Sequence, residues 1–158
     1  MPTTLFDYPL ALTPAWEEIN AQQFFLRGDE KGAAKAGAPV RLQSTRAQEV
    51  HPNLIARREP ANGRALEAYF DEQKALLAKK IPGAKVVKEG KSKIGPLAAV
   101  EIEYAIPLEH PNPSVAQWHA FLARDGFLFA FCGTTTKDRA SGDRKAFRGL
   151  IESWAKGT

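Results

Sequence analysis

Two apolar stretches near the end of the chain, 115–123 and 127–132, are separated by a short link that contains Asp125-Gly126. An Asp-Gly dipeptide between two apolar runs is typical of a two-residue β-hairpin turn. A turn of this kind places Ala120 opposite Phe131, so the side chains on each face of the hairpin follow from the sequence. The chain is therefore expected to contain an antiparallel sheet.

The two faces of this hairpin differ in bulk. The bulky face is expected to be covered by helices, and it carries Trp118, Ala120, Leu122, Phe127, Phe129 and Phe131. The second face mixes apolar and polar side chains, and it carries Val115, Gln117, His119, Phe121, Leu128, Ala130 and Cys132. We expect this second face to lie open, and an open apolar surface marks an interaction site.

A strand, a turn and an amphipathic helix are predicted over residues 53–83. The run NLIARRE suits a strand, and Pro60, Asn62 and Gly63 interrupt it. From Arg64 the apolar side chains recur at three- and four-residue steps, which predicts a helix that Pro82-Gly83 ends. Its apolar stripe consists of Leu66, Tyr69, Phe70, Gln73, Leu76, Leu77 and Ile81.

A second helix is predicted over 143–156, with Ser141 or Asp143 as its cap. Its apolar side consists of Phe147, Leu150, Ile151 and Trp154. Further strands are predicted at 5–12, 22–27, 40–45, 84–89 and 97–106, with turns at 13–16 and 90–93 and an exposed loop from Gly28 to Pro39. Meandering strands with two separated helices indicate an α+β fold with a mainly antiparallel sheet. A chain of 158 residues is expected to form one domain, 1–158.

The chain carries a net charge of +4, and its densest basic run lies at 79–93. Glu89 interrupts this run and no aromatic residues lie within it, which argues against binding of nucleic acid. A solvated helix end followed by an edge strand explains the lysines better. The N-terminal stretch is neither a secretory signal nor a membrane span, so the chain is expected in the cytoplasm and not embedded in a membrane.

No constellation of catalytic or metal-binding residues is recognisable. Glu101 and Glu103 lie two apart on a strand and could form an acid/base pair, but a solvated strand face explains them better. Cys132 and His119 could form a nucleophile pair, but a cysteine in an apolar strand is usually inert. The histidines show no metal-ligand spacing. A non-enzymatic protein without metal or cofactor is therefore expected.

Four stretches together resemble the DcrB-related proteins, whose fold is shared with the PsbP proteins of photosystem II. These stretches are Asn53–Pro60, 66–69, 81–83 and 147–154, and they are fold markers without catalytic residues. The resemblance implies an α/β/α sandwich with an antiparallel sheet. The loop at 28–39 and the link through Val50 are longer than the family pattern.

The resemblance also implies a function, because the cytoplasmic members of this family include the Eag-type chaperones. These act as dimers and shield apolar, transmembrane-like N-terminal segments of type VI secretion effectors. We therefore expect a homodimeric chaperone or adaptor that binds such an effector. The expected partner-binding residues are Gln117, His119, Phe121, Leu128 and Ala130. The alternative is a small-molecule or lipid-binding module with a pocket between sheet and helix.

Overall fold

The computed structural model describes residues 4–6, 8–10, 16–20, 23–26, 52–106 and 115–157. The strands are β1 (Thr4–Leu5), β2 (Tyr8–Pro9), β3 (Trp16–Asn20), β4 (Gln23–Leu26), β5 (Asn53–Pro60), β6 (Lys85–Ile94), β7 (Leu97–Ile106), β8 (Val115–Arg124) and β9 (Phe127–Thr136). The α-helices are α2 (Leu66–Lys80) and α3 (Ala140–Lys156), and a short 3-10 turn (Lys137–Arg139) precedes α3. The predicted loop at 28–39 and strand at 40–45 lie outside the described residues.

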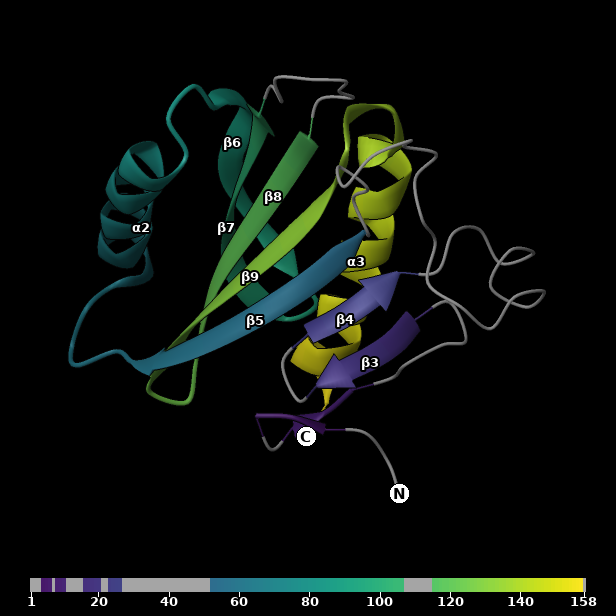
Figure 1. Ribbon diagram of the computed structural model, residues 1–158. Helices are drawn as coiled ribbons and strands as arrows, with labels where there is room; N and C mark the ends of the chain where they lie inside the picture. Colours follow the sequence, from purple (N-terminus) through teal and green to yellow (C-terminus); the bar gives the residue numbers. More distant parts are fainter. Residues whose placement is uncertain are drawn as a thin grey trace.

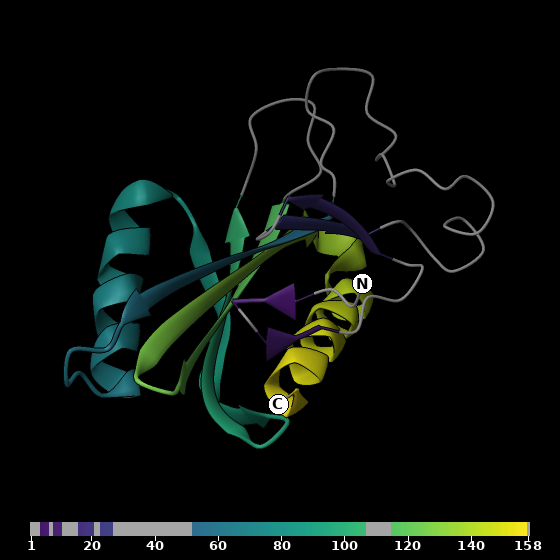
Figure 2. The ribbon, with the colours of Figure 1, turned by 90° about the horizontal axis from the view of Figure 1, so that it is seen from below.

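One antiparallel sheet organises the fold. Its strand order is β3-β4-β5-β9-β8-β7-β6 (Figure 1), and every neighbouring pair is antiparallel. The five long strands β5 to β9 form most of it. Helices α2 and α3 lie on opposite sides of the sheet, which is plain when the molecule is seen from below (Figure 2). The α+β class and the α/β/α sandwich are therefore confirmed.

The predicted hairpin is confirmed in its register. Ala120 lies opposite Phe131 and Arg124 opposite Phe127 in the β8–β9 pair. The turn residue Asp125 has φ 50° and Gly126 has φ 82°, the left-handed backbone that a tight two-residue turn requires. Strand β9 continues beyond the predicted end at 132, as far as Thr136.

Strand β6 is longer than predicted. The sequence prediction ended this strand at 89 and placed a turn at 90–93, and both are wrong. Strand β6 runs through Gly90 to Ile94 because each of these residues pairs with β7, and the turn falls instead at Gly95-Pro96. Pairing with a long neighbour thus overrides the weak strand propensity of a Gly- and Lys-rich run. The lysines do lie on an edge strand, since β6 ends the sheet among the described strands.

The N-terminal prediction is also wrong in form. In place of one strand over 5–12, β1 and β2 form a small antiparallel pair of their own, with Phe6 at φ 50° between them. Trp16, predicted within a turn, begins β3. The strand predicted at 22–27 corresponds to β4, and the one at 97–106 is confirmed as β7.

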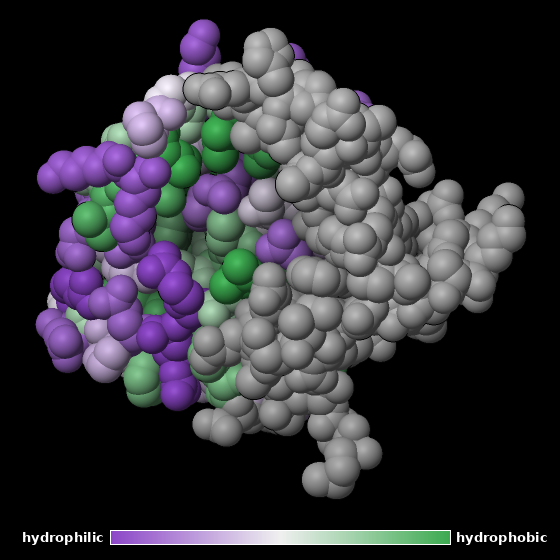
Figure 3. Space-filling view, in the orientation of Figure 1, coloured by the Kyte–Doolittle hydropathy of each residue, from purple (hydrophilic) through white to green (hydrophobic). Residues whose placement is uncertain are grey.

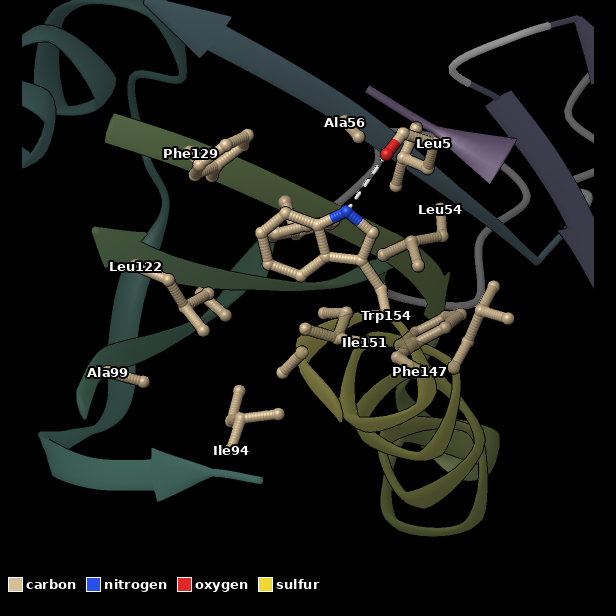
Figure 4. Close-up of a cluster of buried hydrophobic side chains, with 14 of the residues drawn as sticks. Leu5, Leu54, Ala56, Ile94, Ala99, Leu122, Phe129, Phe147, Ile151 and Trp154 are labelled. Carbon is tan, nitrogen blue, oxygen red and sulfur yellow. Dashed lines mark hydrogen bonds between the residues drawn. The ribbon is translucent and has the colours of Figure 1, made fainter. Parts of the chain in front are cut away.

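Helix α3 covers the bulky face of the sheet. Trp154 is fully buried at the centre of this core, and its Nε1 donates to the Leu5 carbonyl oxygen over 3.0 Å (Figure 4). The ring of Trp154 meets Phe129 and Phe131 edge-on, at centroid distances of 4.7 and 5.3 Å. Helix α3 starts at Ala140, earlier than predicted, and no side chain caps it. Asp143 instead accepts a hydrogen bond from Thr135 Oγ1 over 2.5 Å, which ties the helix to β9.

Helix α2 covers much of the second face, so the expectation that this face lies open is wrong. Tyr69 and Phe70 pack edge-on against Phe121, at centroid distances of 5.8 and 5.7 Å. Phe121, Leu128 and Ala130 are at most 3% exposed and belong to the core beneath α2. The physical reason is that an amphipathic helix must bury its apolar stripe, and this face offers enough apolar surface.

Candidate functional site

The second face of the sheet is not covered along its whole length. Side chains of directly paired residues point to the same face, so Ile55, Cys132 and His119 form one row across β5, β9 and β8. The next row contains Thr134 and Gln117. Ile55 is 39% exposed, and Gln117, Cys132 and Thr134 are half-buried. This face therefore keeps a band that solvent reaches.

Helix α2 forms one wall of this band. Arg57 Nη2 donates to Gln73 Oε1 over 3.3 Å, which ties β5 to the helix. Leu76 follows Gln73 by three residues and Tyr69 by seven, so the three lie on the side of α2 that faces β5. Leu76 is 44% exposed. The apolar side chains of Leu76 and Ile55 thus flank the band from two different elements.

We call Ile55, Leu76, Gln117, Cys132 and Thr134 the open strip. Figure 3 shows the surface hollowed beside α2, with both apolar and polar residues on the floor. Three strands and one helix position these side chains. The strip is therefore part of the packed fold and does not depend on a single loop.

A polar network forms the floor of the open strip. His119 Nε2 donates to Gln117 Oε1 over 2.8 Å, and Gln117 Nε2 donates to Thr134 Oγ1 over 3.3 Å. The His119 ring is only 4% exposed, because it stacks on Phe121 and meets Tyr104 edge-on. Of the five expected partner-binding residues, only Gln117 reaches the strip's surface; His119 supports it from below.

The electrostatics of this network oppose catalysis by Cys132 and His119. Burial, with a smaller contribution from Arg57, lowers the pKa of His119 to about 4, so the ring is neutral near pH 7. Burial raises the pKa of Cys132 to about 11, so its sulfur remains a thiol. Cys132 Sγ lies 3.9 Å from a His119 nitrogen that Gln117 already occupies. The pair lacks the features of an activated nucleophile.

Glu101 and Glu103 lie on the opposite face, beneath α3. Arg144 Nη1 donates to Glu103 over 2.7 Å, and Arg148 pairs with Glu101. Burial alone would raise the pKa of Glu101, but hydrogen bonds from Arg148, Ser92 and Trp118 and the Arg148 charge hold it below its usual value. Each carboxylate thus has its own arginine, and an acid/base pair is not what this geometry provides.

A cavity of about 450 Å³ opens between β6, β7 and α3. Its lining is mostly charged and includes Lys88, Glu101, Arg144 and Lys145, with Trp118 as the aromatic element. This is where the alternative prediction of a pocket between sheet and helix would apply. Binding of a small molecule there stays a prediction.

Several residues of these two surfaces were not identified from the sequence. Arg144 and Arg148 lie four residues apart, on one side of α3, and Glu101 and Glu103 lie two apart, on one face of β7. Two arginines and two glutamates at these spacings are a sequence signal for a pair of ion pairs between the helix and the strand. Ile55 and Leu76 gave no such signal, because their exposure depends on how far α2 reaches across the sheet. In the described part of the chain, no three His, Cys, Asp or Glu side chains are grouped to hold a metal ion.

Neither of the described helices is long and apolar enough to cross a membrane. No curated protein sequence matches the chain. Among solved structures, the chain is similar to a protein of unknown function from Pseudomonas aeruginosa, PA94, described as a putative regulator. The TM-score is 0.53 and the identity 18%, over 97% of this chain and 94% of that chain.

It is also similar to LpqN from Mycobacterium tuberculosis, a protein involved in cell envelope biogenesis, with a TM-score of 0.59 and 12% identity over 96% of this chain and 86% of that one. Cyanobacterial PsbP (CyanoP) from Synechocystis matches with a TM-score of 0.48 and 12% identity, over 90% of this chain and 93% of that one. The first two likenesses show the fold. The model of the DcrB family matches residues 42–153, which is most of the chain. The chain therefore belongs to the DcrB family.

Proposed function

We propose that this chain is a non-catalytic, polypeptide-binding protein that shields an apolar segment of its partner on the open strip. The observation that carries the proposal is the exposure of Ile55 and Leu76, 39% and 44%, on either side of a polar floor. Large apolar side chains that stay exposed on a folded protein can provide anchoring contacts for a partner.

The polar floor suits an apolar helix that carries small polar residues. Gln117 has two amide hydrogens and donates one of them to Thr134, and none of the described residues accepts the other, which could bond with a partner. The thiol of Cys132 adds a weakly polar contact. Small polar residues of a membrane-type helix need such partners once the helix leaves the lipid.

The proposed partner is a type VI secretion effector whose N-terminal segments resemble transmembrane helices. Membership of the DcrB family and the resemblance to the Eag-type chaperones support this partner class. The protein would act in the cytoplasm, as a homodimer, before the effector is exported. Two copies of the open strip would cover more of an apolar helix than one copy can.

The test uses a fluorescent peptide of about 20 apolar residues with Ser and Gly along one side, flanked by polar residues. Binding is measured by anisotropy for the wild type and for Ile55→Glu and Leu76→Glu. Because a buried unpaired carboxylate is costly, each substitution should weaken binding at least about tenfold.

Val87→Glu is the matched control, because Val87 is 59% exposed on β6, outside the open strip. It should bind the peptide like the wild type. Equal binding by all four proteins, or no binding by the wild type, would contradict the proposal. Sedimentation equilibrium tests the dimer separately, against the monomer mass of 17.3 kDa.

A further inference from the structure

Strand β6 presents a long exposed edge on the side of the sheet away from β5. It is ten residues long, it ends the sheet among the described strands, and most of its side chains are exposed. Val86 and Val87 are 46% and 59% exposed. An edge of this kind carries unpaired backbone groups and can accept an additional strand.

The charge of this edge is strongly positive. Strand β6 contains four lysines and one glutamate. The glutamate, Glu89, is already paired with Lys74 of α2 at 2.7 Å, and Lys91 lies 3.8 Å from Glu67. The remaining lysines of β6 form no ion pair with a described carboxylate; they are Lys85, Lys88 and Lys93.

The cavity of about 450 Å³ adjoins this edge. Its two carboxylates, the half-buried Glu101 and the buried Glu103, are each paired with an arginine of α3. The cationic side chains left over in the lining on this side are Lys88 from β6 and Lys145 from α3. Gly90 is also part of the lining, and the space beside its Cα is open, because a Cβ there would meet nothing within 4 Å.

We propose that the β6 edge binds an extended acidic peptide as an added strand, with one of its carboxylate side chains in the cavity beside Lys88 and Lys145. The backbone edge supplies hydrogen bonds and the lysines supply the charge match. The lysines that discourage pairing with a neutral or basic strand favour an acidic one. This surface lies apart from the open strip and does not depend on the function proposed above.

Charge also decides against the other occupants of the edge. A second copy would bring its own four lysines against these four, which is repulsive at close range. Nucleic acid would find no aromatic side chain on β6 on which its bases could stack.

The experiment uses the full chain and two fluorescent peptides of about ten residues, one alternating Glu and Val and the other alternating Lys and Val. Anisotropy should show binding of the acidic peptide alone, weaker at higher salt. The double variant K88E/K145E should bind it at least about tenfold more weakly. Backbone amides of β6 should exchange hydrogen more slowly when the acidic peptide is bound.

The control variant K79E/K80E makes the same change in net charge at the end of α2, outside the lining of the cavity, and should bind like the wild type within about threefold. Three outcomes would overturn the proposal: equal loss in both variants, equal binding of the two peptides, or displacement of the acidic peptide by a single-stranded oligonucleotide at lower concentration. The apolar peptide of the previous section should bind K88E/K145E normally, so the two proposals fail independently.

Discussion

Gly133 on β9 makes room for an aromatic side chain of α3. A Cβ at this position would lie within 2.9 Å of three ring atoms of Phe147, and that ring is also stacked on Trp118 at 6.1 Å. Because the ring is held from both sides, Gly133→Ala should lower the free energy of unfolding by about 1–3 kcal/mol. Urea denaturation measures this loss.

Gly149→Ala is the matched control, since Gly149 is an exposed position of α3 and a Cβ there meets nothing within 4 Å. Alanine is the better helix former, so this variant should be more stable than the wild type by about 0.5–1 kcal/mol. If both glycine variants lost stability equally, the close packing of Phe147 on Gly133 would not be the cause.

His119 should make the stability of the protein depend on pH. The pKa of His119 is lowered from 6.5 to about 4 in the folded state, chiefly by burial. Above pH 6.5 both states are neutral; below it the unfolded chain binds a proton that the folded chain refuses, so stability falls until about pH 4. Because of His119, the free energy of unfolding should therefore fall by about 2 kcal/mol from pH 7 to pH 5.

The measurement compares the wild type with His119→Gln, which is neutral at every pH and keeps a donor for Gln117. From pH 7 to pH 5, the wild type should lose about 2 kcal/mol more of its free energy of unfolding than the variant does. The carboxylates titrate equally in both proteins, so their effect drops out of the comparison. A difference that stays constant with pH would show that His119 is protonated as readily in the folded protein as in the unfolded chain.

At the scale of elements, Arg124 of β8 holds the C-terminal end of α3. Its guanidinium donates to the Trp154 carbonyl over 2.7 Å and to the Gly157 carbonyl, and it lies 3.6 Å from the centre of the Tyr8 ring. Carbonyls in the last turn of a helix lack the full set of intrahelical hydrogen bonds and favour a cation. Arg124→Ala should therefore lower the free energy of unfolding by about 1.5–3 kcal/mol.

Thermal or urea denaturation of Arg124→Ala and Arg124→Lys separates charge from geometry. Lysine keeps the charge but cannot reach two carbonyls with one planar fork, so the Lys variant should fall between wild type and Ala. A Lys variant as stable as the wild type would reduce the role of Arg124 to charge alone.

Local signals predicted some elements well and others poorly. The hairpin β8–β9 and helix α2 depend on a turn dipeptide and an apolar period, which the sequence shows directly. The full length of β6 could not be predicted in this way, because its second half is held by pairing with β7. Propensity alone favours a turn at Gly90.

The candidate site follows the same division. Gln117 could be assigned to its face by alternation, but the position of α2 over Phe121 could not, because both faces of the sheet contain apolar residues. Exposure of Ile55 and Leu76 results from where the helix ends its coverage. That is a property of packing between elements distant in the sequence.

For the whole molecule, the strand order predicts a gradient of local stability. Strands β9 and β8 are central and have long partners on both sides, whereas β6 has a partner on one side among the described strands. Among the five long strands, amide hydrogen exchange should be slowest in β8 and β9 and fastest in the edge strand β6. If the amides on both edges of β6 exchanged slowly in the isolated protein, the outer edge of β6 would already be paired with another strand or covered by another segment.

Strand β5 pairs along its whole length with β9, although β6, β7 and β8 separate the two in the chain. During synthesis, β5 leaves the ribosome with one edge bare, and its partner β9 emerges only after β6, β7 and β8 have been made. The meander from β6 to β8 can assemble earlier, because its neighbours are adjacent in the chain. Joining β5 to β9 closes the longest loop between paired strands of the described sheet. A ribosome that stalls before β9 is made would therefore carry a nascent chain in which β5 has an unpaired edge, and such a chain is prone to aggregate.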